Sequence, residues 1–191
     1  EYVFVSRSPT KLNINSKSYQ DRVRFGANVR QLKPGDLSDL EPALSSEYAS
    51  AVAVAGQGRA TNPGRLAKVI GELVVADGGE FIKGDAQDIR PNSGGGATLR
   101  VGEQTIEARR LIVAAGAWSH ELASKFGLNV PLQGERGYHM QFAEPGVTLN
   151  NSVCDADRKF VASSMEGGVR CAGTSEFNSL DAEPNWRRAD I

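Results

Sequence analysis

Nucleophilic and metal-binding side chains are few in this chain, and their spacing is not that of a hydrolase or a zinc site. The two cysteines, Cys154 and Cys171, have no adjacent histidine or basic pair that would favour a thiolate. Ser119 has no GxSxG motif around it. The two histidines, His120 and His139, form no HxxxH or HExxH motif, and no CxxC motif occurs. A hydrolase and a structural zinc site are therefore disfavoured.

A run of small residues points instead to a ligand that comes close to the backbone. The stretch "LIVAAGAWS" (residues 111–119) is an apolar segment that ends on Ala114, Ala115, Gly116 and Ala117. Read as a buried strand, it would let a flat or charged ligand approach the main chain at its carboxyl end. Small residues also occur where a helix packs tightly on a strand, so the pattern alone leaves both interpretations open.

The segments before this run alternate between strand and helix patterns. Residues 48–56 indicate a buried strand, and residues 59–79 indicate an amphipathic helix with Asn62 as its cap and Pro63 at its first position. Residues 80–92 indicate a strand, followed by a hairpin with "SGGG" at its tip. At the N-terminus we expect a hairpin-like pair over residues 1–14, then a polar helix within 15–30 and a short helix within 32–44.

The segments after the run change character. Residues 120–128 indicate a short helix closed by Gly127, and residues 130–177 indicate an antiparallel sheet. The predicted fold class is therefore α/β plus α+β.

The totals indicate an ordinary globular protein. The chain has 191 residues, a net charge of -1 and 40% apolar residues, and its apolar runs are too short to span a bilayer. No nucleic-acid footprint is present. Two cysteines do not form a disulfide framework, which favours a reducing, cytoplasmic compartment. Since the chain lacks an initiator Met, we expect an internal piece of a longer protein.

Three segments resemble one family of flavoenzymes. They are "NPGRLAKVIGELVVADGGEF", "LIVAAGAWSHELASKFGLNVPLQGERGYHM" and "MEGGVRCAGTSEF". They are similar to the FAD-dependent amino-acid oxidoreductases, which include D-amino-acid dehydrogenases and oxidases, glycine oxidase and sarcosine oxidase, and most of all to the D-amino-acid-dehydrogenase type. The resemblance implies part of a Rossmann-like FAD lobe (residues 56–129) and an antiparallel-sheet substrate lobe (residues 1–55 and 130–191).

The resemblance also implies which residues lie near the cofactor. The flavin would lie near Ala115, Gly116 and Ala117, and Trp118 could cover its edge or only pack the next helix onto the sheet. The strand that contains Ala86 and Gln87 would supply backbone contacts to the adenine end. The family's GxGxxG fingerprint, which supports the pyrophosphate, does not occur in this sequence. We therefore expect FAD in the full-length protein but not in the isolated 191-residue chain.

Four residues are the candidates for substrate binding by the same resemblance. Arg136 could hold a substrate carboxylate, or it could form a salt bridge with Glu135 or another acid. Tyr138 and His139 alternate along one strand, so at most one of them faces a cleft, and Tyr138 is preferred. Phe160 stands where several relatives place a substrate-contacting tyrosine, although core packing explains it equally well. No residue of the chain is expected to be a catalytic acid, base or nucleophile, since the cofactor carries the chemistry.

Two further residues are expected to have a structural role. Arg170 and Glu176 lie on the last predicted strand, and we expect them to form an ion pair with each other.

Two hypotheses of function follow. The first is a fragment of a FAD-dependent oxidoreductase that oxidises the C–N bond of an amino acid or related amine, a small-molecule substrate; neither nucleic acid nor metal is expected as a partner. The second is a self-standing, non-catalytic α+β binding or interaction module. Exposed sheet edges in a fragment would permit a homodimer. The substrate and the electron acceptor stay open, and a quinone acceptor would place the whole protein at a membrane.

Overall fold

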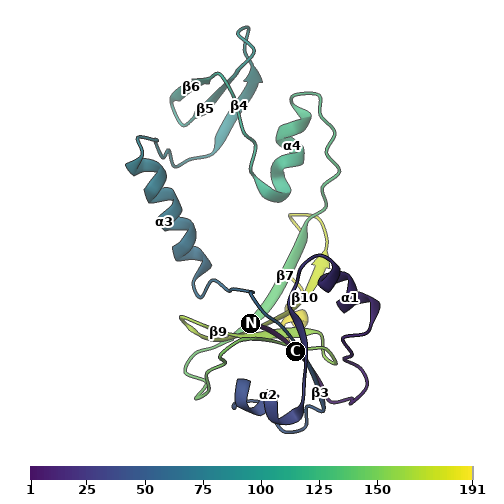
Figure 1. Cartoon of the computed structure of the whole chain (residues 1–191). Helices are drawn as coiled ribbons and strands as arrows, with labels where there is room; N and C mark the ends of the chain where they lie inside the picture. The colour runs from purple at the N-terminus through teal and green to yellow at the C-terminus, as the bar shows by residue number, and fades with distance from the viewer. Residues whose placement is uncertain (191) are drawn as a thin grey trace. The chain divides into compact units, whose positions relative to one another are not determined.

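Strand β3 (Ser50–Val54) lies near one edge of a seven-stranded sheet, and all five of its residues are buried. The computed structural model describes residues 1–190, apart from the side chain of Pro34. The sheet has the order β2-β3-β1-β8-β9-β10-β7. Figure 1 labels β3, β7, β9 and β10 of this sheet. The other strands are β1 (Tyr2–Ser6), β2 (Val29–Leu32), β7 (Glu135–Phe142), β8 (Ser152–Asp155), β9 (Phe160–Met165) and β10 (Gly168–Phe177).

The sheet is mixed rather than purely antiparallel. The ladders β1–β3, β2–β3, β8–β9 and β9–β10 are antiparallel. The last two lie within residues 130–177, where an antiparallel sheet was predicted. Strand β1, however, pairs in parallel with β8. The predicted hairpin over residues 1–14 is therefore wrong: β1 takes its partners from β3 and β8, far away in the sequence, and no second strand follows it before residue 15.

The chain divides into two compact units. The first unit comprises Glu1–Leu66, Gly137–Ser175 and the chain from Pro184 onward, and the second comprises Ala67–Arg136 and Glu176–Glu183. The first unit holds most of the seven-stranded sheet, together with α1 (Lys17–Arg24) and α2 (Pro34–Leu40). Both helices lie within the ranges that the sequence predicts.

The core of the first unit follows from alternation along its strands. Val3 and Val5 of β1 face a cluster that includes Ala51, Ala53 and Val153. The opposite face of the sheet carries Val52 and Phe4, which pack against Tyr19 of α1. Because successive side chains of a strand point to opposite faces, one apolar strand contributes to both clusters.

The second unit contains a three-stranded antiparallel meander of β4 (Ala86–Pro91), β5 (Ala97–Val101) and β6 (Gln104–Ala108). The glycine-rich segment forms the β4–β5 turn, as predicted. Most of α3 (Pro63–Ala76) and all of α4 (Ser119–Ser124) belong to the same unit. The cap of α3 is the one expected, since Asn62 Oδ1 accepts a hydrogen bond of 2.8 Å from the Arg65 N–H.

Two expectations for the second unit are wrong in the described structure. Residues 111–115 form no strand, and Ile112 is exposed. The strand predicted from residue 80 begins only at Ala86. An extended segment needs a neighbouring strand to pair its N–H and C=O groups, and the described residues provide none at 111–115.

Candidate functional site

A cavity of about 240 Å³ in the second unit is the candidate functional site. It brings together residues that the sequence assigned separately to cofactor and substrate, Ala117 and Trp118 on one side and Arg136 on the other. The remaining lining residues are Gly134, Glu135, Asn178, Ser179 and Leu180. Segments that lie far apart in the sequence thus meet at one concave surface.

The first wall is a tight turn that exposes the backbone. Gly116 begins the short 3-10 helix η1 (Gly116–Trp118) and has a φ of +56°, a conformation that favours glycine. A hydrogen bond of 3.1 Å from the Ala115 N–H to Ser119 Oγ fixes the turn. A Cβ atom built on Gly116 would have no neighbour within 4 Å, and Trp118 is 57% exposed. Gly116 therefore has open space beside its backbone, and no described residue packs against this position.

The second wall is held by contacts between two chain segments. Gln133 Nε2 donates to the Asn178 carbonyl at 2.8 Å, and the Asn178 N–H donates to the Gly134 carbonyl at 3.2 Å. A Cβ atom on Gly134 would lie 2.9 Å from the Leu180 side chain and 3.1 Å from the Asn178 carbonyl oxygen. Glycine is therefore the residue that lets the segments approach this closely.

Arg136 is held firmly at the cavity. Its Nη1 lies 3.1 Å from Glu176 Oε1, and its Nη2 donates to the Ala182 carbonyl at 2.7 Å. Glu176 is only 8% exposed, so its carboxylate forms a largely desolvated pair with the guanidinium. The expected pairing of Glu176 with Arg170 is therefore wrong, because Glu176 pairs with Arg136 instead. Of the two interpretations of Arg136, the structure shows the salt bridge with an acid.

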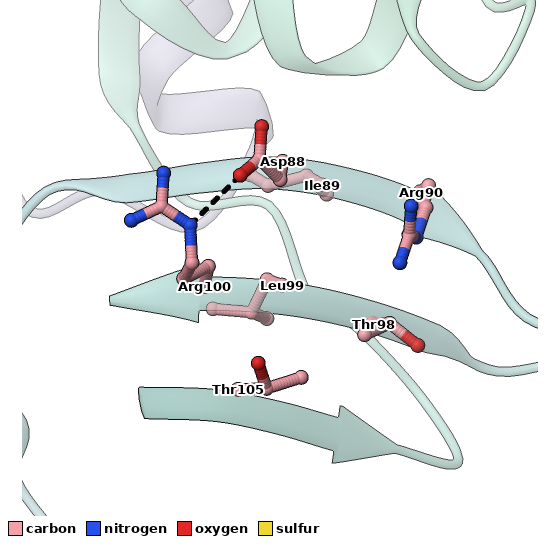
Figure 2. A pocket seen from close by; sticks show the side chains of 7 residues that line it. All are labelled: Asp88, Ile89, Arg90, Thr98, Leu99, Arg100 and Thr105. Atoms are coloured by element: carbon pink, nitrogen blue, oxygen red, sulfur yellow. Dashed lines mark hydrogen bonds and ion pairs between the residues drawn. The ribbon is translucent and has the colours of Figure 1, made fainter. Parts of the chain in front are cut away.

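The other residues assigned to the cofactor do not line this cavity. Ala86 and Gln87 are exposed on β4, where Gln87 Oε1 accepts a hydrogen bond of 2.6 Å from Arg100 Nη2. Beside them, Asp88 and Arg100 form an ion pair of 2.8 Å at the rim of a second concavity of about 300 Å³ on the meander (Figure 2).

Three residues assigned to the substrate lie in the first unit. Tyr138 is 5% exposed; its hydroxyl accepts a hydrogen bond of 2.8 Å from the Asn185 N–H, and its ring meets Trp186 edge-on. His139 is exposed, and its Nδ1 lies 3.5 Å from Arg170 Nη2. Phe160 is half-buried at the start of β9. Tyr138 thus has the contacts of a packing residue.

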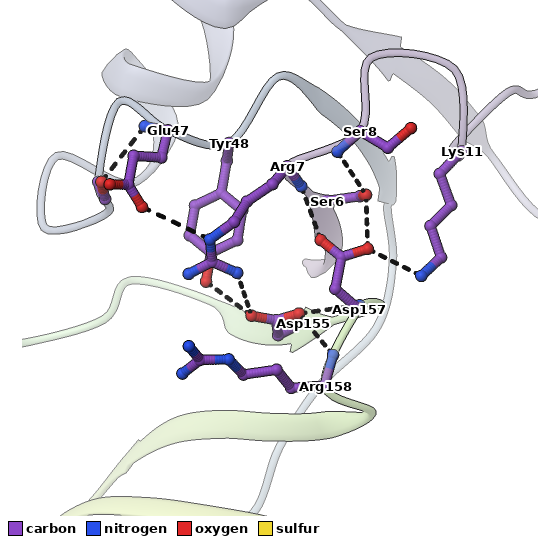
Figure 3. Close-up of polar contacts among 10 residues, drawn as sticks. Ser6, Arg7, Ser8, Lys11, Glu47, Tyr48, Asp155, Asp157 and Arg158 are labelled. Carbon is purple, nitrogen blue, oxygen red and sulfur yellow. Dashed lines mark hydrogen bonds and ion pairs between the residues drawn. The ribbon is translucent and has the colours of Figure 1, made fainter.

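A polar cluster in the first unit was not anticipated from the sequence. The buried Asp155 accepts hydrogen bonds from Arg7 Nη1 at 3.0 Å, the Tyr48 hydroxyl at 2.9 Å and two backbone N–H groups (Figure 3). Burial raises the pKa of Asp155, but these hydrogen bonds outweigh it and lower the pKa overall.

Asp157 is the second carboxylate of this polar cluster. The ammonium group of Lys11, the Arg7 N–H and the Ser6 hydroxyl lower the pKa of Asp157 to about 2. Every acceptor in the cluster is used by a protein donor, so its role is to join β1 to the turn after β8. No short motif marks such a cluster, because its members come from three distant segments.

The surroundings of the two cysteines disfavour a reactive thiolate. Burial raises the thiol pKa of both Cys154 and Cys171, and both are free. Among residues 1–190, no group of three or more His, Cys, Asp or Glu side chains is arranged to hold a metal ion. The same residues contain no helix with the length and apolar character that crossing a bilayer requires.

The comparisons with known proteins define the class. The model of the DAO family, described as "FAD dependent oxidoreductase", matches residues 2–191. The chain therefore belongs to the DAO family of FAD-dependent oxidoreductases, whose members bind FAD.

Individual relatives are named as oxidases or dehydrogenases of amino acids. The chain is 31% identical over 179 residues to a D-amino-acid oxidase of Bradyrhizobium diazoefficiens, covering 93% of this chain and 42% of that protein. It superposes on glycine oxidase from Geobacillus kaustophilus with a TM-score of 0.74 at 20% identity, covering 96% of this chain and 50% of that one. For L-proline dehydrogenase from P. horikoshii the TM-score is 0.79 at 14% identity, with coverage of 98% and 52%. These two structures establish the fold, and the chain spans about half the length of the proteins that it matches.

The described residues fit part of an FAD site. The open backbone at Gly116 and the exposed Trp118 ring provide a surface that a planar group can approach. A glycine-rich pyrophosphate loop is not found in this sequence.

Proposed function

We propose that this chain is a fragment of an oxidoreductase that oxidises the C–N bond of an amino acid or related amine. The single observation that carries the proposal is the cavity that joins the Ala117–Trp118 turn to Arg136 within one unit. Membership of a FAD-dependent family and the names of the relatives support this reaction class. FAD, when bound, accepts the hydride that leaves the α-carbon.

The residues of the chain position the cofactor and the substrate, and none of them takes part in the reaction itself. The backbone at Ala115, Gly116 and Ala117 lies against the cofactor, and Trp118 forms a wall beside it. Ala86 and Gln87 contact its adenine end. In this proposal residues 56–129 form part of the FAD lobe, while residues 1–55 and 130–191 form the substrate lobe.

Arg136 is the proposed contact for the substrate carboxylate at this cavity. Its pairing with the buried Glu176 fixes the plane of the guanidinium, so that a substrate meets a preorganised group rather than a mobile one. Tyr138, His139 and Phe160 are the further substrate contacts that we propose from the sequence.

The cellular compartment and the pairing of two copies are part of the same proposal. Two free, half-buried cysteines are compatible with a reducing, cytoplasmic compartment. The outer strands β2 and β7 of the large sheet offer edges through which two copies of the chain could pair.

The deciding experiment uses the product of the complete reading frame that encodes this chain. Its visible absorbance is recorded anaerobically before and after addition of a panel of D-amino acids, glycine and sarcosine. A flavin spectrum that bleaches supports the proposal, and splitting the panel identifies the substrate. A protein that FAD cannot turn yellow would contradict the proposed function and would leave the non-catalytic module as the better hypothesis.

A matched pair of variants tests the position of the cofactor. Gly116→Val places a side chain into the open face of the turn, and we expect at least a tenfold loss of FAD affinity, about 1.4 kcal/mol. Gly102→Val is the control: Gly102 also has a positive φ and open space around it, but it lies in the β5–β6 turn. Equal losses of affinity in both variants would contradict the proposed position.

A further inference from the structure

The candidate cavity in the second unit is lined by a single cationic side chain. Arg136 is the only lysine, arginine or histidine among its lining residues, all of which belong to the part of the chain that the structure describes. Its Nη1 donates to Glu176 Oε1 and its Nη2 donates to the Ala182 carbonyl. A guanidinium group has five N–H donors, so Arg136 retains donors for one carboxylate of a ligand.

Two carboxylates accompany this single cation. Glu176 lies 3.1 Å from Arg136 and is 8% exposed, so water screens its charge only weakly. Glu135, the residue before Arg136, lines the cavity itself. At neutral pH glutamate is ionised, so two negative charges face one positive charge at this site.

The rest of the lining is uncharged. Ala117, Leu180 and the half-exposed ring of Trp118 form apolar walls, while Asn178 and Ser179 are neutral polar residues. The volume of about 240 Å³ lies below the range of about 300–1,000 Å³ that is typical of sites for drug-sized ligands. The cavity therefore suits a small molecule, and it provides no cation for a second carboxylate.

We propose that Glu135 determines the specificity of this cavity, so that the site selects amino acids with a single carboxylate and rejects those with an acidic side chain. This inference rests on the proposed function, in which Arg136 holds the substrate carboxylate. A second carboxylate in so small a cavity would lie close to the charges of Glu135 and Glu176, and like charges repel at short range. The site thus discriminates by repulsion of the wrong substrate as well as by attraction of the right one.

The test uses two probes of nearly the same shape, succinate and succinamate, in which an amide replaces one carboxylate. Their competitive inhibition constants are measured with the product of the complete reading frame, against the amino acid or amine that bleaches the flavin. We expect succinamate to bind the wild type at least about tenfold more tightly, the effect of one like charge at a partly solvated site. Because salt screens charges, 1 M NaCl should reduce this ratio.

A matched pair of variants assigns the effect to Glu135. Glu135→Gln keeps the size of the side chain but removes its charge, so the ratio of the two inhibition constants should fall to about threefold or less. A purely structural effect would weaken both probes alike and would leave the ratio unchanged. Glu103→Gln is the control, since Glu103 is an exposed glutamate in the β5–β6 turn and is not a lining residue of the cavity. It should leave both constants as they are in the wild type.

The outcomes separate this proposal from the proposed function. If the wild type oxidises no amine, the proposed function falls and the specificity of Glu135 falls with it. If it oxidises amines but succinate binds as tightly as succinamate, or neither probe competes, the specificity alone is overturned. A ratio in Glu135→Gln within twofold of the wild-type ratio would overturn it as well, and so would faster oxidation of D-glutamate than of D-glutamine by the wild type.

Discussion

The first unit encloses its apolar residues, whereas the second leaves many of them exposed. Val52 in β3 has no exposed surface, and its strand lies between β1 and β2 with helices over the sheet. The large apolar residues of α3 in the second unit are 44–59% exposed; they are Val69, Ile70, Leu73, Val74 and Val75. Both regions have clear apolar patterns, but only in the first unit do other residues cover the apolar side chains.

The difference shows what a sequence pattern determines and what it leaves open. A period of 3.6 specifies that α3 forms and which of its faces is apolar. The covering surface must come from other strands or helices, and the helix pattern carries no information about them. The contrast predicts that substitutions in the closed core cost more stability than matched substitutions elsewhere.

The largest effect is expected at Glu41, which is fully buried in the first unit. Its carboxylate accepts hydrogen bonds from the Asn150 N–H at 3.0 Å, from the Asn151 N–H, and from Asn151 Nδ2 at 2.8 Å. Glu41→Ala leaves these donors without acceptors and should lower the free energy of unfolding by about 3–5 kcal/mol. Urea unfolding followed by Trp186 fluorescence, with Trp118 replaced by Phe, measures it.

The control for this prediction is Glu47→Ala, since the Glu47 side chain is 71% exposed. Its loss should change the free energy of unfolding by less than about 1 kcal/mol. Similar losses in both variants would mean that Glu41 does not tie α2 to the loop before β8.

The next effect compares Val52→Ala with Leu73→Ala. Val52→Ala removes two buried carbon atoms and leaves a cavity, so the first unit should lose about 2 kcal/mol. Leu73→Ala shortens an exposed side chain and should change stability by less than about 0.5 kcal/mol, although it removes more carbon atoms. Urea midpoints of the two variants decide between these outcomes, and a large loss at Leu73 would show that α3 is covered in solution.

Much of the first unit could be predicted from local sequence. The run at 48–56 and the polar helix within 15–30 require only alternation, period and flanking turn residues. The parallel β1–β8 pair could not be predicted in this way, because it joins residues about 150 positions apart and depends on the closure of the whole sheet. The wrong hairpin at 1–14 has the same cause.

The candidate site was predictable at one wall only. The small residues 114–117 predict a backbone that a ligand can approach, and Gly116 lies in an open turn with a positive φ although the preceding predicted strand is absent. The partner of Arg136 was not predictable, since Glu135 and other acids were equally plausible from the sequence, and the geometry of β10 places Glu176 beside it. The buried Arg170 Nε, which has no hydrogen-bond partner, could not be predicted from the sequence either.

A moderate, pH-dependent effect is expected in the polar cluster of the first unit. Because the pKa of Asp157 falls from 3.8 to about 2 on folding, its stabilising contribution is present above pH 3.8 and is lost as the pH falls toward 2. In Asp157→Asn this contribution is absent, so wild type and variant should differ in urea midpoint at pH 5 and converge near pH 2. A difference that persists at pH 2 would contradict the assignment.

The partner of Asp157 provides the control. Lys11→Met removes the ammonium group that contributes most to the low pKa, so the convergence should move to higher pH. Lys68→Met removes an exposed charge from α3 and should leave the convergence where it is.

The smallest effect is expected for the Asp88–Arg100 pair on the meander of the second unit. Both side chains are exposed and 2.8 Å apart, so solvent and salt screen their attraction. Asp88 also has a φ of +51°, which asparagine adopts readily, so Asp88→Asn removes the charge without adding backbone strain. The variant should therefore lose less than about 1 kcal/mol, and the loss should vanish in 1 M NaCl. Urea unfolding followed by Trp118 fluorescence, with Trp186 replaced by Phe, measures both values. A larger loss that salt does not reduce would mean that Asp88 lies in a surface that other residues cover, and the contrast between the two units would then be narrower than their exposed areas indicate.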